Sequence, residues 1–307
     1  MTKRVIRIRV GPGDAPTWLS EPIRNGGAVP IAAGDADALI WYHGAAGDLA
    51  LAIAEMPSLR WVALASAGIE PYVPLIDDRR IWTAACGIYG EAVAEHALAL
   101  LLAGRRGIAA FSRRRSWSPA AGRSLYGARV TIVGGGICAS LTRLLEPFRA
   151  RVCVVRKHPL PMAGTEFVLG PDKLDAALAG ADAVVLACPL TDETRHMMDA
   201  KRLALLGPGA WLVNVGRGAL VVTEDLVDAL KNGLLGGAAL DVTDPEPLPE
   251  GHALWTAGRC IVTPPSANPI ELSRPRLAAH LENNVGRFVL GEDLLDLVDP
   301  AAGYSGY

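Results

Sequence analysis

Short apolar runs recur along the whole chain, and in its second half they contain almost no polar positions. Strands that are buried on both faces have this pattern, whereas a strand with one face in water alternates between apolar and polar residues. The first run, in MTKRVIRIRV, does alternate and is typical of an opening strand. We interpret the following segments as strands: Val5–Val10, Ala38–Tyr42, Trp61–Ala65, Ile81–Ala85, Arg129–Val133, Arg151–Val155, Ala183–Ala187, Ala210–Val215, Gly237–Val242 and Cys260–Val262.

Helical patterns fill many of the stretches between these strands. One long helix is expected from Glu91 to about Gly107. Another is expected near the end of the chain, with Asn268 as its N-cap, Pro269 at its first position and Glu271 where a capping box requires it. Strands that alternate with helices form parallel sheets with right-handed crossovers. The pattern therefore predicts an α/β fold, and 307 residues are enough for two domains.

Composition narrows the classes of function. Half of the residues are hydrophobic and a fifth are charged, as in globular proteins. The formal net charge of -2 argues against a nucleic-acid partner, because binding to a phosphate backbone requires a basic surface. We expect the most basic positions on a solvated helix face and in the loop after it: Arg105, Arg106, Arg113, Arg114, Arg115 and Arg123.

Cysteine spacing and hydropathy bear on the compartment. The five cysteines, at positions 86, 138, 153, 188 and 260, show no paired spacing, which argues against a disulfide framework or a metal site. The N-terminal segment has no apolar signal-peptide core. The most apolar helix, EAVAEHALALLLAG, is interrupted by Glu95 and His96 and is too short to span a bilayer. We therefore expect a cytoplasmic protein with no membrane partner.

The segment RVTIVGGGICAS contains the sharpest local motif. Gly134, Gly136 and Ala139 match G-x-G-x-x-A directly after a strand and at the start of an apolar helix, which also places Ile137 and Cys138 in the turn. Such glycines let the backbone approach a pyrophosphate, whose charge then lies at the helix N-terminus. A plain tight turn is the alternative, but the strand–turn–helix context favours a dinucleotide site.

The end of the next strand bears on the choice of dinucleotide. An NAD site usually has an acidic residue about twenty positions after the glycines, where it binds the ribose hydroxyls. Here RVCVVRKHP ends in Arg156 and Lys157, which can bind a 2′-phosphate through charge-assisted hydrogen bonds. The alternative is a basic strand end at the surface. NADP is the predicted cofactor, with NAD still possible.

Several further segments match one enzyme family in order and spacing. They are LASAGIE, AVAEHALALLLA, the glycine turn, ACPLTDETRHMM, WLVNVGRGALV and AALDVTDPEPLPEGHALW. With them the chain resembles the D-isomer-specific 2-hydroxyacid dehydrogenases, a group that includes glyoxylate/hydroxypyruvate reductases and phosphoglycerate dehydrogenases.

The resemblance implies two Rossmann-like domains. A flavodoxin-like substrate domain would comprise residues 1–98 and 285–307, and an inserted dinucleotide-binding domain with a doubly wound parallel sheet would comprise residues 99–284, with a cleft where the two meet. It also implies a small 2-keto or 2-hydroxy acid as substrate, and a homodimer built around the helix that contains Glu95 and His96.

Reduction of a 2-keto acid requires a cation for the carboxylate and keto oxygen, a proton donor, and a nicotinamide over one carbonyl face. Arg217 follows a strand and has the two-pronged guanidinium that binds carboxylates, as the family's arginine does. By resemblance, Asp241 contacts the nicotinamide amide, and Glu246 pairs with a catalytic histidine and raises its pKa. The remaining implied contacts are the cofactor-binding Pro189, Thr194 and Val215 and the substrate-binding Ala67 and Gly68. Independently of the resemblance, Trp41, with Tyr42 and Ile88–Tyr89, is a candidate to shape the substrate pocket.

One position departs from the family. The strand end that reads Thr-Pro-His in the family reads Thr263-Pro264-Pro265 here, and proline has no proton to donate. Loss of a positioned general acid costs roughly 10²–10⁴ in rate. His43, at the carboxyl end of a substrate-domain strand, is a candidate substrate contact or substitute acid; otherwise it is an ordinary loop histidine.

Two classes of function follow. The first is an NADP-dependent 2-keto acid reductase that is slow, or that obtains its proton through His43, Glu246 or water. The alternative is a catalytically weakened dinucleotide-binding protein that acts as a sensor or interaction module. The presence of Arg217, Asp241 and Glu246 favours the enzyme, because a binding module does not need that set.

Overall fold

The computed structural model describes residues 4–117, 119, 121–299 and 304–305, and most of its strands belong to two separate parallel sheets. The chain divides into unit 1, Met1–Tyr89 with Ile270–Tyr307, and unit 2, Gly90–Pro269. From the sequence, the two boundaries between the domains were predicted further along the chain, after residues 98 and 284. Both of these positions lie inside a helix. Each of these helices belongs wholly to one unit, because one continuous apolar face packs on one sheet.

Unit 1 contains a five-stranded parallel sheet in the order β2-β1-β3-β4-β5. This is the flavodoxin-like order, so the predicted fold of the substrate domain is confirmed. The strands are β1 (Arg7–Gly11), β2 (Val29–Ile31), β3 (Ala38–Trp41), β4 (Trp61–Leu64) and β5 (Ile81–Ala84), and a short antiparallel pair, β13 (Val298–Asp299) with β14 (Tyr304–Ser305), follows near the C-terminus.

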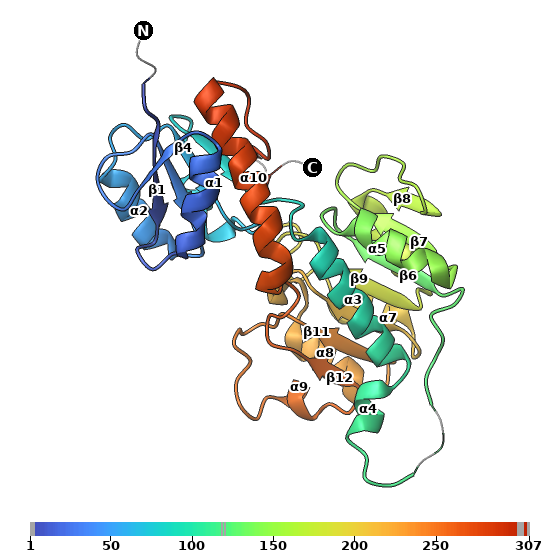
Figure 1. The fold of residues 1–307 in the computed structure, drawn as a ribbon. Helices are drawn as coiled ribbons and strands as arrows, with labels where there is room; N and C mark the ends of the chain where they lie inside the picture. Colours follow the sequence, from blue (N-terminus) through green and yellow to red (C-terminus); the bar gives the residue numbers. More distant parts are fainter. Residues whose placement is uncertain (1–3, 118, 120, 300–303, 306–307) are drawn as a thin grey trace. The chain divides into compact units, whose positions relative to one another are not determined.

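Helices cover both faces of this sheet. On one face, α1 (Ser20–Asn25) lies beside α10 (Ile270–Leu290), as Figure 1 shows, and the two helices bury leucine, isoleucine and valine side chains against β1, β3 and β4. On the other face lie α2 (Ala46–Ala54) and the 3-10 helix η2 (Glu70–Leu75). The 3-10 turn η1 (Thr17–Leu19) precedes α1.

Unit 2 contains a seven-stranded parallel sheet in the order β12-β11-β10-β9-β6-β7-β8. This is the doubly wound order of dinucleotide-binding domains with one strand added, so the predicted doubly wound sheet is confirmed. The strands are β6 (Arg129–Val133), β7 (Arg151–Val155), β8 (Phe167–Leu169), β9 (Ala183–Leu186), β10 (Trp211–Asn214), β11 (Gly237–Leu240) and β12 (Cys260–Val262).

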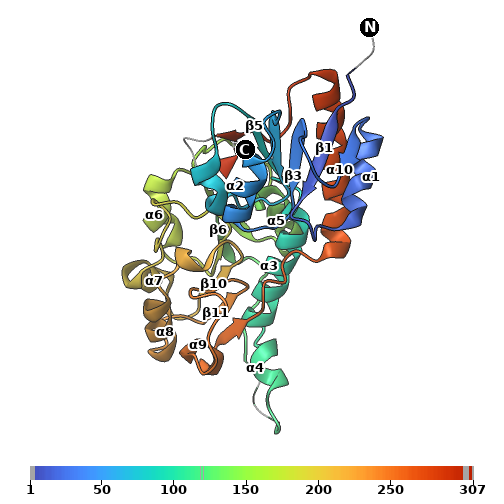
Figure 2. The ribbon, with the colours of Figure 1, turned by 90° about the vertical axis from the view of Figure 1, so that its left-hand side faces the viewer.

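The two faces of the second sheet are covered by different helices. On one face α3 (Gly90–Arg105) packs beside α5 (Cys138–Leu145), and α4 (Ile108–Ser112) follows α3. The other face carries α6 (Leu174–Leu178), α7 (Ala200–Leu206), α8 (Thr223–Lys231) and α9 (Ala253–Thr256), of which α6, α7 and α8 follow one another down the left of Figure 2. Short 3-10 turns are η3 (Glu146–Phe148), η4 (Pro171–Lys173) and η5 (Gly218–Leu220).

Most predicted elements are present with small shifts. The strands over 129–133, 151–155 and 260–262 have the predicted bounds, and α10 begins one residue after the predicted Pro269. The edge strands β2 and β8 were not predicted. None of the helices in the described residues combines the length and apolar character of a membrane span.

One basic residue is placed differently from the expectation. Arg105 is only 4% exposed, so its assignment to a solvated helix face is wrong. Its guanidinium donates to the carbonyl oxygens of Ser124, at 2.6 and 3.2 Å, and Asp182, at 2.7 Å. These bonds tie the segment after α4 to the start of β9, and they compensate for the burial of the charge.

A buried amide holds the segment that follows α10. Asn284 is fully buried; its Nδ2 donates to the Leu295 carbonyl at 3.2 Å and its Oδ1 accepts from the Leu295 N–H at 2.8 Å. Replacing Asn284 with leucine leaves both backbone groups without this partner, so we expect Asn284→Leu to lower the free energy of unfolding by about 1–3 kcal/mol. Urea unfolding followed by circular dichroism measures this. The exposed neighbour is the control, since Asn283→Leu should change little, and equal effects of the two substitutions would contradict the prediction.

Candidate functional site

The strand order of unit 2 reverses between β6 and β9. The loop after β6 leads to α5 on one face, and the loop after β9 leads to α7 on the other. Ligands of doubly wound sheets bind where such loops diverge, at the carboxyl ends of the strands. The predicted cofactor residues lie in loops at this edge of the sheet or, in the case of Cys138, at the first position of α5.

The glycine turn has a geometry that only glycine can adopt. Gly134, directly after β6, has φ +129°, and a Cβ placed on it would lie 2.4 Å from the carbonyl oxygen of Ala187 after β9. The two loops at the switch point therefore touch through their backbones. A side chain here would separate them, because that distance is shorter than any real Cβ contact.

Helix α5 begins immediately after this turn. Among the described residues, no side chain caps its first turn at Ile137, so the amino end can receive an anion from outside the helix. The Sγ of Cys138 is buried 2.7 Å from the Gly134 carbonyl oxygen, to which it donates, and burial raises the pKa of this thiol to about 12. Cys138 thus supports the turn as a neutral side chain.

The end of β7 carries the two predicted cations. Arg156 is half-buried and donates from Nη2 to the Leu160 carbonyl at 2.6 Å. Its Nε–H is buried and has no hydrogen-bond partner among the described residues. Lys157 is exposed at the same strand end. A buried, unpaired guanidinium N–H is costly, and an anion next to it would remove that cost.

The loop after β9 is held by a threonine. Thr194 Oγ1 donates to the Pro189 carbonyl at 2.8 Å and accepts from the Thr191 N–H at 2.8 Å. The predicted cofactor residues Pro189 and Thr194 are therefore brought together in one tight loop. Cys188 in the same loop is buried, and burial raises the pKa of its thiol to about 12.

The loop after β10 carries Arg217 and is organised by a residue that the sequence analysis did not single out. Asn214, 1% exposed, donates to the Arg217 carbonyl at 2.8 Å and accepts from the Gly216 N–H at 3.1 Å. A polar residue at the end of an apolar strand, as in WLVN, was the available signal. Val215 lies between the strand and this turn.

The loops after β10 and β11 are in backbone contact. A Cβ on Gly218 would lie 1.9 Å from the Thr243 carbonyl oxygen, so no larger residue fits there. This contact brings the half-buried Arg217 close to the loop that carries Glu246. Glu246 is exposed, and its Oε2 accepts from the Thr243 N–H at 3.4 Å.

Asp241, directly after β11, is buried and accepts several hydrogen bonds. Its Oδ1 accepts from Thr263 Oγ1 at 2.7 Å, from the Ser266 N–H at 2.9 Å and from His96 Nε2 at 3.0 Å. Its Oδ2 accepts from the Ala267 N–H at 3.1 Å. Burial alone would raise the pKa of Asp241, but these hydrogen bonds outweigh it and hold the pKa below its ordinary value.

Asp241 thereby anchors the segment after β12 that contains the two prolines. Both Pro264 and Pro265 are exposed, and neither offers a side-chain proton. From the sequence, His96 was expected only on a helix at a dimer interface. The sequence around His96, a histidine followed by an apolar helical run, does not indicate its contact with Asp241.

In unit 1, the predicted substrate residues follow β3 and β4, again at carboxyl ends. Ala67 and Gly68 lie in a turn that is closed by Ser66 Oγ, which donates to the Gly68 carbonyl at 2.9 Å. His43 is exposed and has φ +53°, a left-handed conformation that is uncommon for a residue with a side chain. Its ring lies 4.5 Å from that of Tyr42, and loss of water around it lowers the pKa of His43.

Trp41 differs from the other predicted substrate residues. Its indole is 3% exposed and belongs to the core below β3. A Cβ on Gly11 or Gly44 would lie within 2.7 Å of the ring, so both glycines are packed against it. We therefore assign Trp41 to the core, where its side chain offers almost no surface to a substrate.

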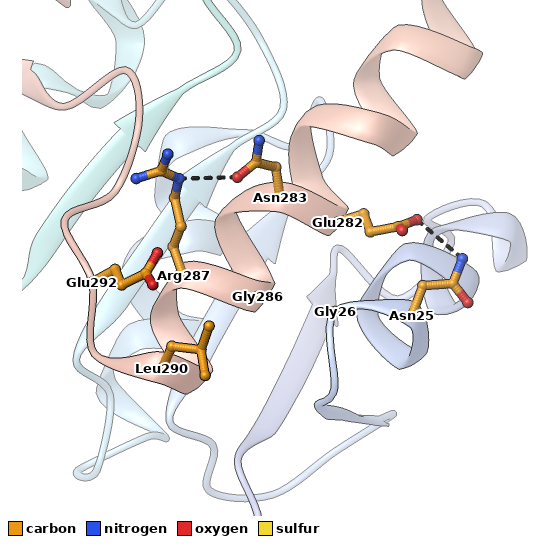
Figure 3. A pocket seen from close by; sticks show the side chains of 8 residues that line it. All are labelled: Asn25, Gly26, Glu282, Asn283, Gly286, Arg287, Leu290 and Glu292. Carbon is orange, nitrogen blue, oxygen red and sulfur yellow. Dashed lines mark hydrogen bonds between the residues drawn. The ribbon is translucent and has the colours of Figure 1, made fainter.

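A shallow depression of about 360 Å³ lies elsewhere on unit 1, between α1 and α10 (Figure 3). Its polar groups bond to one another, since Asn25 Nδ2 donates to Glu282 Oε2 at 3.0 Å and Arg287 Nε donates to Asn283 Oδ1 at 2.9 Å. The C-terminal end of α1 lies at the amino edge of the sheet, away from the strand ends that bind ligands. We do not assign a function to it. It is lined by Asn25, Gly26, Glu282, Asn283, Gly286, Arg287, Leu290 and Glu292.

The sheet order, the glycine turn and the loops at the carboxyl edge define unit 2 as an NAD(P)-binding domain of the Rossmann type. Comparison with known proteins agrees. The sequence profile of the D-isomer specific 2-hydroxyacid dehydrogenase NAD binding domain matches residues 96–267. The chain therefore belongs to the D-isomer specific 2-hydroxyacid dehydrogenase family, whose members are oxidoreductases acting on CH–OH groups. The resemblance inferred from the sequence is confirmed.

Individual relatives agree with this assignment. The chain is 38% identical over 280 residues, 88% of its length and 90% of the relative's, to a Corynebacterium melassecola protein described as an uncharacterized protein in proB 3'region. It is 34% identical over 215 residues to a glyoxylate reductase of Pyrococcus furiosus, covering 66% of this chain and 64% of that enzyme, just under two thirds. A D-isomer specific 2-hydroxyacid dehydrogenase from Xanthobacter autotrophicus Py2, solved with NADPH and MES, superposes with a TM-score of 0.86 at 28% identity, covering 98% of this chain and 100% of that one.

The glycine turn can be tested by substitution. Gly134→Ala introduces a Cβ at φ +129° that clashes with Ala187, so we expect about 1–3 kcal/mol of backbone strain and a loss of dinucleotide affinity of at least about ten-fold. Fluorescence titration with NADPH, on protein whose fold is checked by circular dichroism, measures this. Gly258→Ala is the control, because a Cβ there would meet no atom within 4 Å. Unchanged affinity in Gly134→Ala would disprove the assignment of the turn.

Proposed function

We propose that the protein is an NADP-dependent 2-keto acid reductase. The observation that carries the proposal is that Arg217 and Asp241 lie at the carboxyl ends of adjacent strands, in loops whose backbones touch. A cation that can bind a carboxylate and an acceptor for the nicotinamide amide are thereby held close together in the half of the sheet beyond the switch point. Family membership supports the reaction class.

The residues present fit a nicotinamide dinucleotide. The turn at Gly134 and the uncapped start of α5 suit a pyrophosphate. Gly136 and Ile137 complete the turn, Cys138 is the first residue of α5, and Pro189, Thr194 and Val215 lie in the loops that follow β9 and β10. When bound as NADPH, the cofactor would supply the hydride that the keto carbon of the substrate accepts.

Arg156 and Lys157 support the choice of NADP over NAD. A 2′-phosphate at this strand end would give the buried Nε–H of Arg156 the partner that it lacks among the described residues. The structural relative from Xanthobacter autotrophicus Py2 was solved with NADPH, which is consistent with this choice.

The remaining residues are assigned by their chemistry. Arg217 binds the substrate carboxylate and polarises the keto oxygen, and the backbone N–H groups of Ala67 and Gly68 receive the carboxylate. Proton delivery to the alkoxide is the weak step, since Pro265 replaces the expected acid. His43 is the candidate substitute, with Glu246 or water as the other sources. We also propose a homodimer and a cytoplasmic location.

Pro265, which has no proton to donate, also favours a second candidate function. A protein that binds NADP(H) but has lost its general acid can act as a sensor or an interaction module. Steady-state oxidation of NADPH with glyoxylate, hydroxypyruvate and phenylpyruvate separates the two functions. Turnover with any of these acids supports the reductase; tight NADPH binding without turnover supports the sensor.

Cofactor preference should depend on Arg156. We expect NADPH to bind more tightly than NADH, and Arg156→Asp to narrow or reverse the preference, because a carboxylate repels a 2′-phosphate and accepts hydrogen bonds from ribose hydroxyls. Dissociation constants for both cofactors measure this. Lys173→Asp is the control, since it makes the same charge change elsewhere on unit 2. Equal affinities of the unmodified protein for the two cofactors would rule out the NADP assignment.

The missing acid can be restored. If only the donor is absent, Pro265→His recreates a histidine near Glu246, which favours the protonated imidazole. We expect kcat toward a 2-keto acid to rise by about ten-fold or more, given the roughly 10²-fold lower bound for general-acid effects. Pro265→Ala is the control for loss of the proline ring and should give no such rise. No gain in Pro265→His with any small 2-keto acid would favour the sensor.

A further inference from the structure

His96 makes a contact with Asp241 that the proposed function does not use. It lies on α3, and its Nε2 is 3.0 Å from Asp241 Oδ1 and 3.5 Å from Thr263 Oγ1. Its side chain is 20% exposed, and that of Asp241 is 4% exposed. The carboxylate at the end of β11 is thus bonded to a helix and to the loop after β12 at once.

The donors around Asp241 are distributed unevenly. Oδ1 accepts from three donors, which are His96 Nε2, Thr263 Oγ1 and the Ser266 N–H. Oδ2 accepts from the Ala267 N–H. A carboxylate has about four lone-pair sites, two on each oxygen, so the unused acceptor capacity is on Oδ2. The donors on Oδ1 fix the plane of the carboxylate and therefore the direction of that remaining lone pair.

The position of Asp241 indicates which part of a dinucleotide it would meet. The glycine turn and Arg156 belong to the half of the sheet formed by β6, β7 and β8, whereas Asp241 follows β11 in the other half. A dinucleotide lies across the two halves, with its phosphates at the switch point. With the adenosine end at Arg156, the nicotinamide end lies on the side of Asp241.

We propose that His96 is a positioning residue for the nicotinamide end of the cofactor site and that it acts through Asp241. The inference rests on the proposed function in that it requires a nicotinamide cofactor. The Nε2–H of His96, with the Thr263 hydroxyl, holds the carboxylate so that Oδ2 can accept a hydrogen bond from the carboxamide NH₂. The Nε2–H is directed at Asp241, so this nitrogen does not serve as the acid that Pro265 lacks.

The test compares two ligands and two substitutions of one residue. His96→Leu removes the donor and keeps an apolar side chain, whereas His96→Gln keeps an N–H donor at a similar reach. Dissociation constants are measured on the full chain for NADPH and for 2′-phospho-ADP-ribose, which contains the same adenosine and pyrophosphate but no nicotinamide. Glu95→Gln, an exposed neighbour on α3, is the matched control.

We expect His96→Leu to raise the dissociation constant of NADPH by about ten-fold, as loss of one charge-assisted hydrogen bond does. The dissociation constant of 2′-phospho-ADP-ribose should stay within about two-fold of its value in the unmodified protein. His96→Gln should restore most of the NADPH affinity, and Glu95→Gln should have no effect. In an Asp241→Asn background, His96→Leu should add little, because the two residues act as one unit.

Other outcomes overturn the inference. Equal weakening of both ligands would mean that His96 only supports the fold, and no weakening of either would mean that the contact has no role in binding. Failure of His96→Gln to recover affinity would exclude the hydrogen bond as the cause. If the unmodified protein binds NADPH no more tightly than 2′-phospho-ADP-ribose, the nicotinamide contributes no affinity and the proposed role of His96 is excluded. If the unmodified protein binds neither NADPH nor NADH, the proposed function itself fails.

Discussion

The main constraint on this protein is that the central strands of its parallel sheets are buried on both faces. In unit 2 even the alternating positions of one strand, such as Val184 and Val185, are both fully buried, each under a different layer of helices. No charged group can face such a layer without a large desolvation cost. Polar chemistry is therefore confined to the ends of the strands. Because the strands are parallel, the loops that follow them all lie along one edge.

The loops along that edge are in contact through their backbones. Glycines are therefore required there because no side chain fits between the loops, and not because the chain must be flexible. Gly134 brings the loops after β6 and β9 together, and Gly218 does the same for the loops after β10 and β11. Each contact removes the space that a side chain would occupy. The residues that remain, such as Arg217, are held by polar partners in their own loops: Asn214 donates to the Arg217 backbone carbonyl, and Arg217 Nη1 donates to the Gly216 carbonyl.

Much of this could be predicted from the sequence, and the failures have physical causes. The central strands were found because two-sided burial gives them uninterrupted apolar runs. The edge strands β2 and β8 were missed because none of their residues is fully buried, whereas the equally short edge strand β12 has a buried Cys260 and was found. Arg105 was misread, and the contact of His96 with Asp241 was not predicted, for a shared reason. A polar residue within a helix is by default a solvated one, and only the fold shows that carbonyl oxygens or a carboxylate lie opposite it.

Under the proposed function, Pro265 stands where an acid is expected, and the backbone path of the segment after β12 does not depend on that residue. Of the residues from Thr263 to Ala267, two are prolines without an N–H, and the other three N–H groups are all bonded. Thr263 donates to the Leu240 carbonyl, and Ser266 and Ala267 donate to Asp241. Each N–H group of this segment therefore has a partner, and none of these hydrogen bonds involves residue 265. The path of the chain is therefore set by Asp241 and β11, so the side chain at position 265 can change while Asp241 remains where the fold holds it.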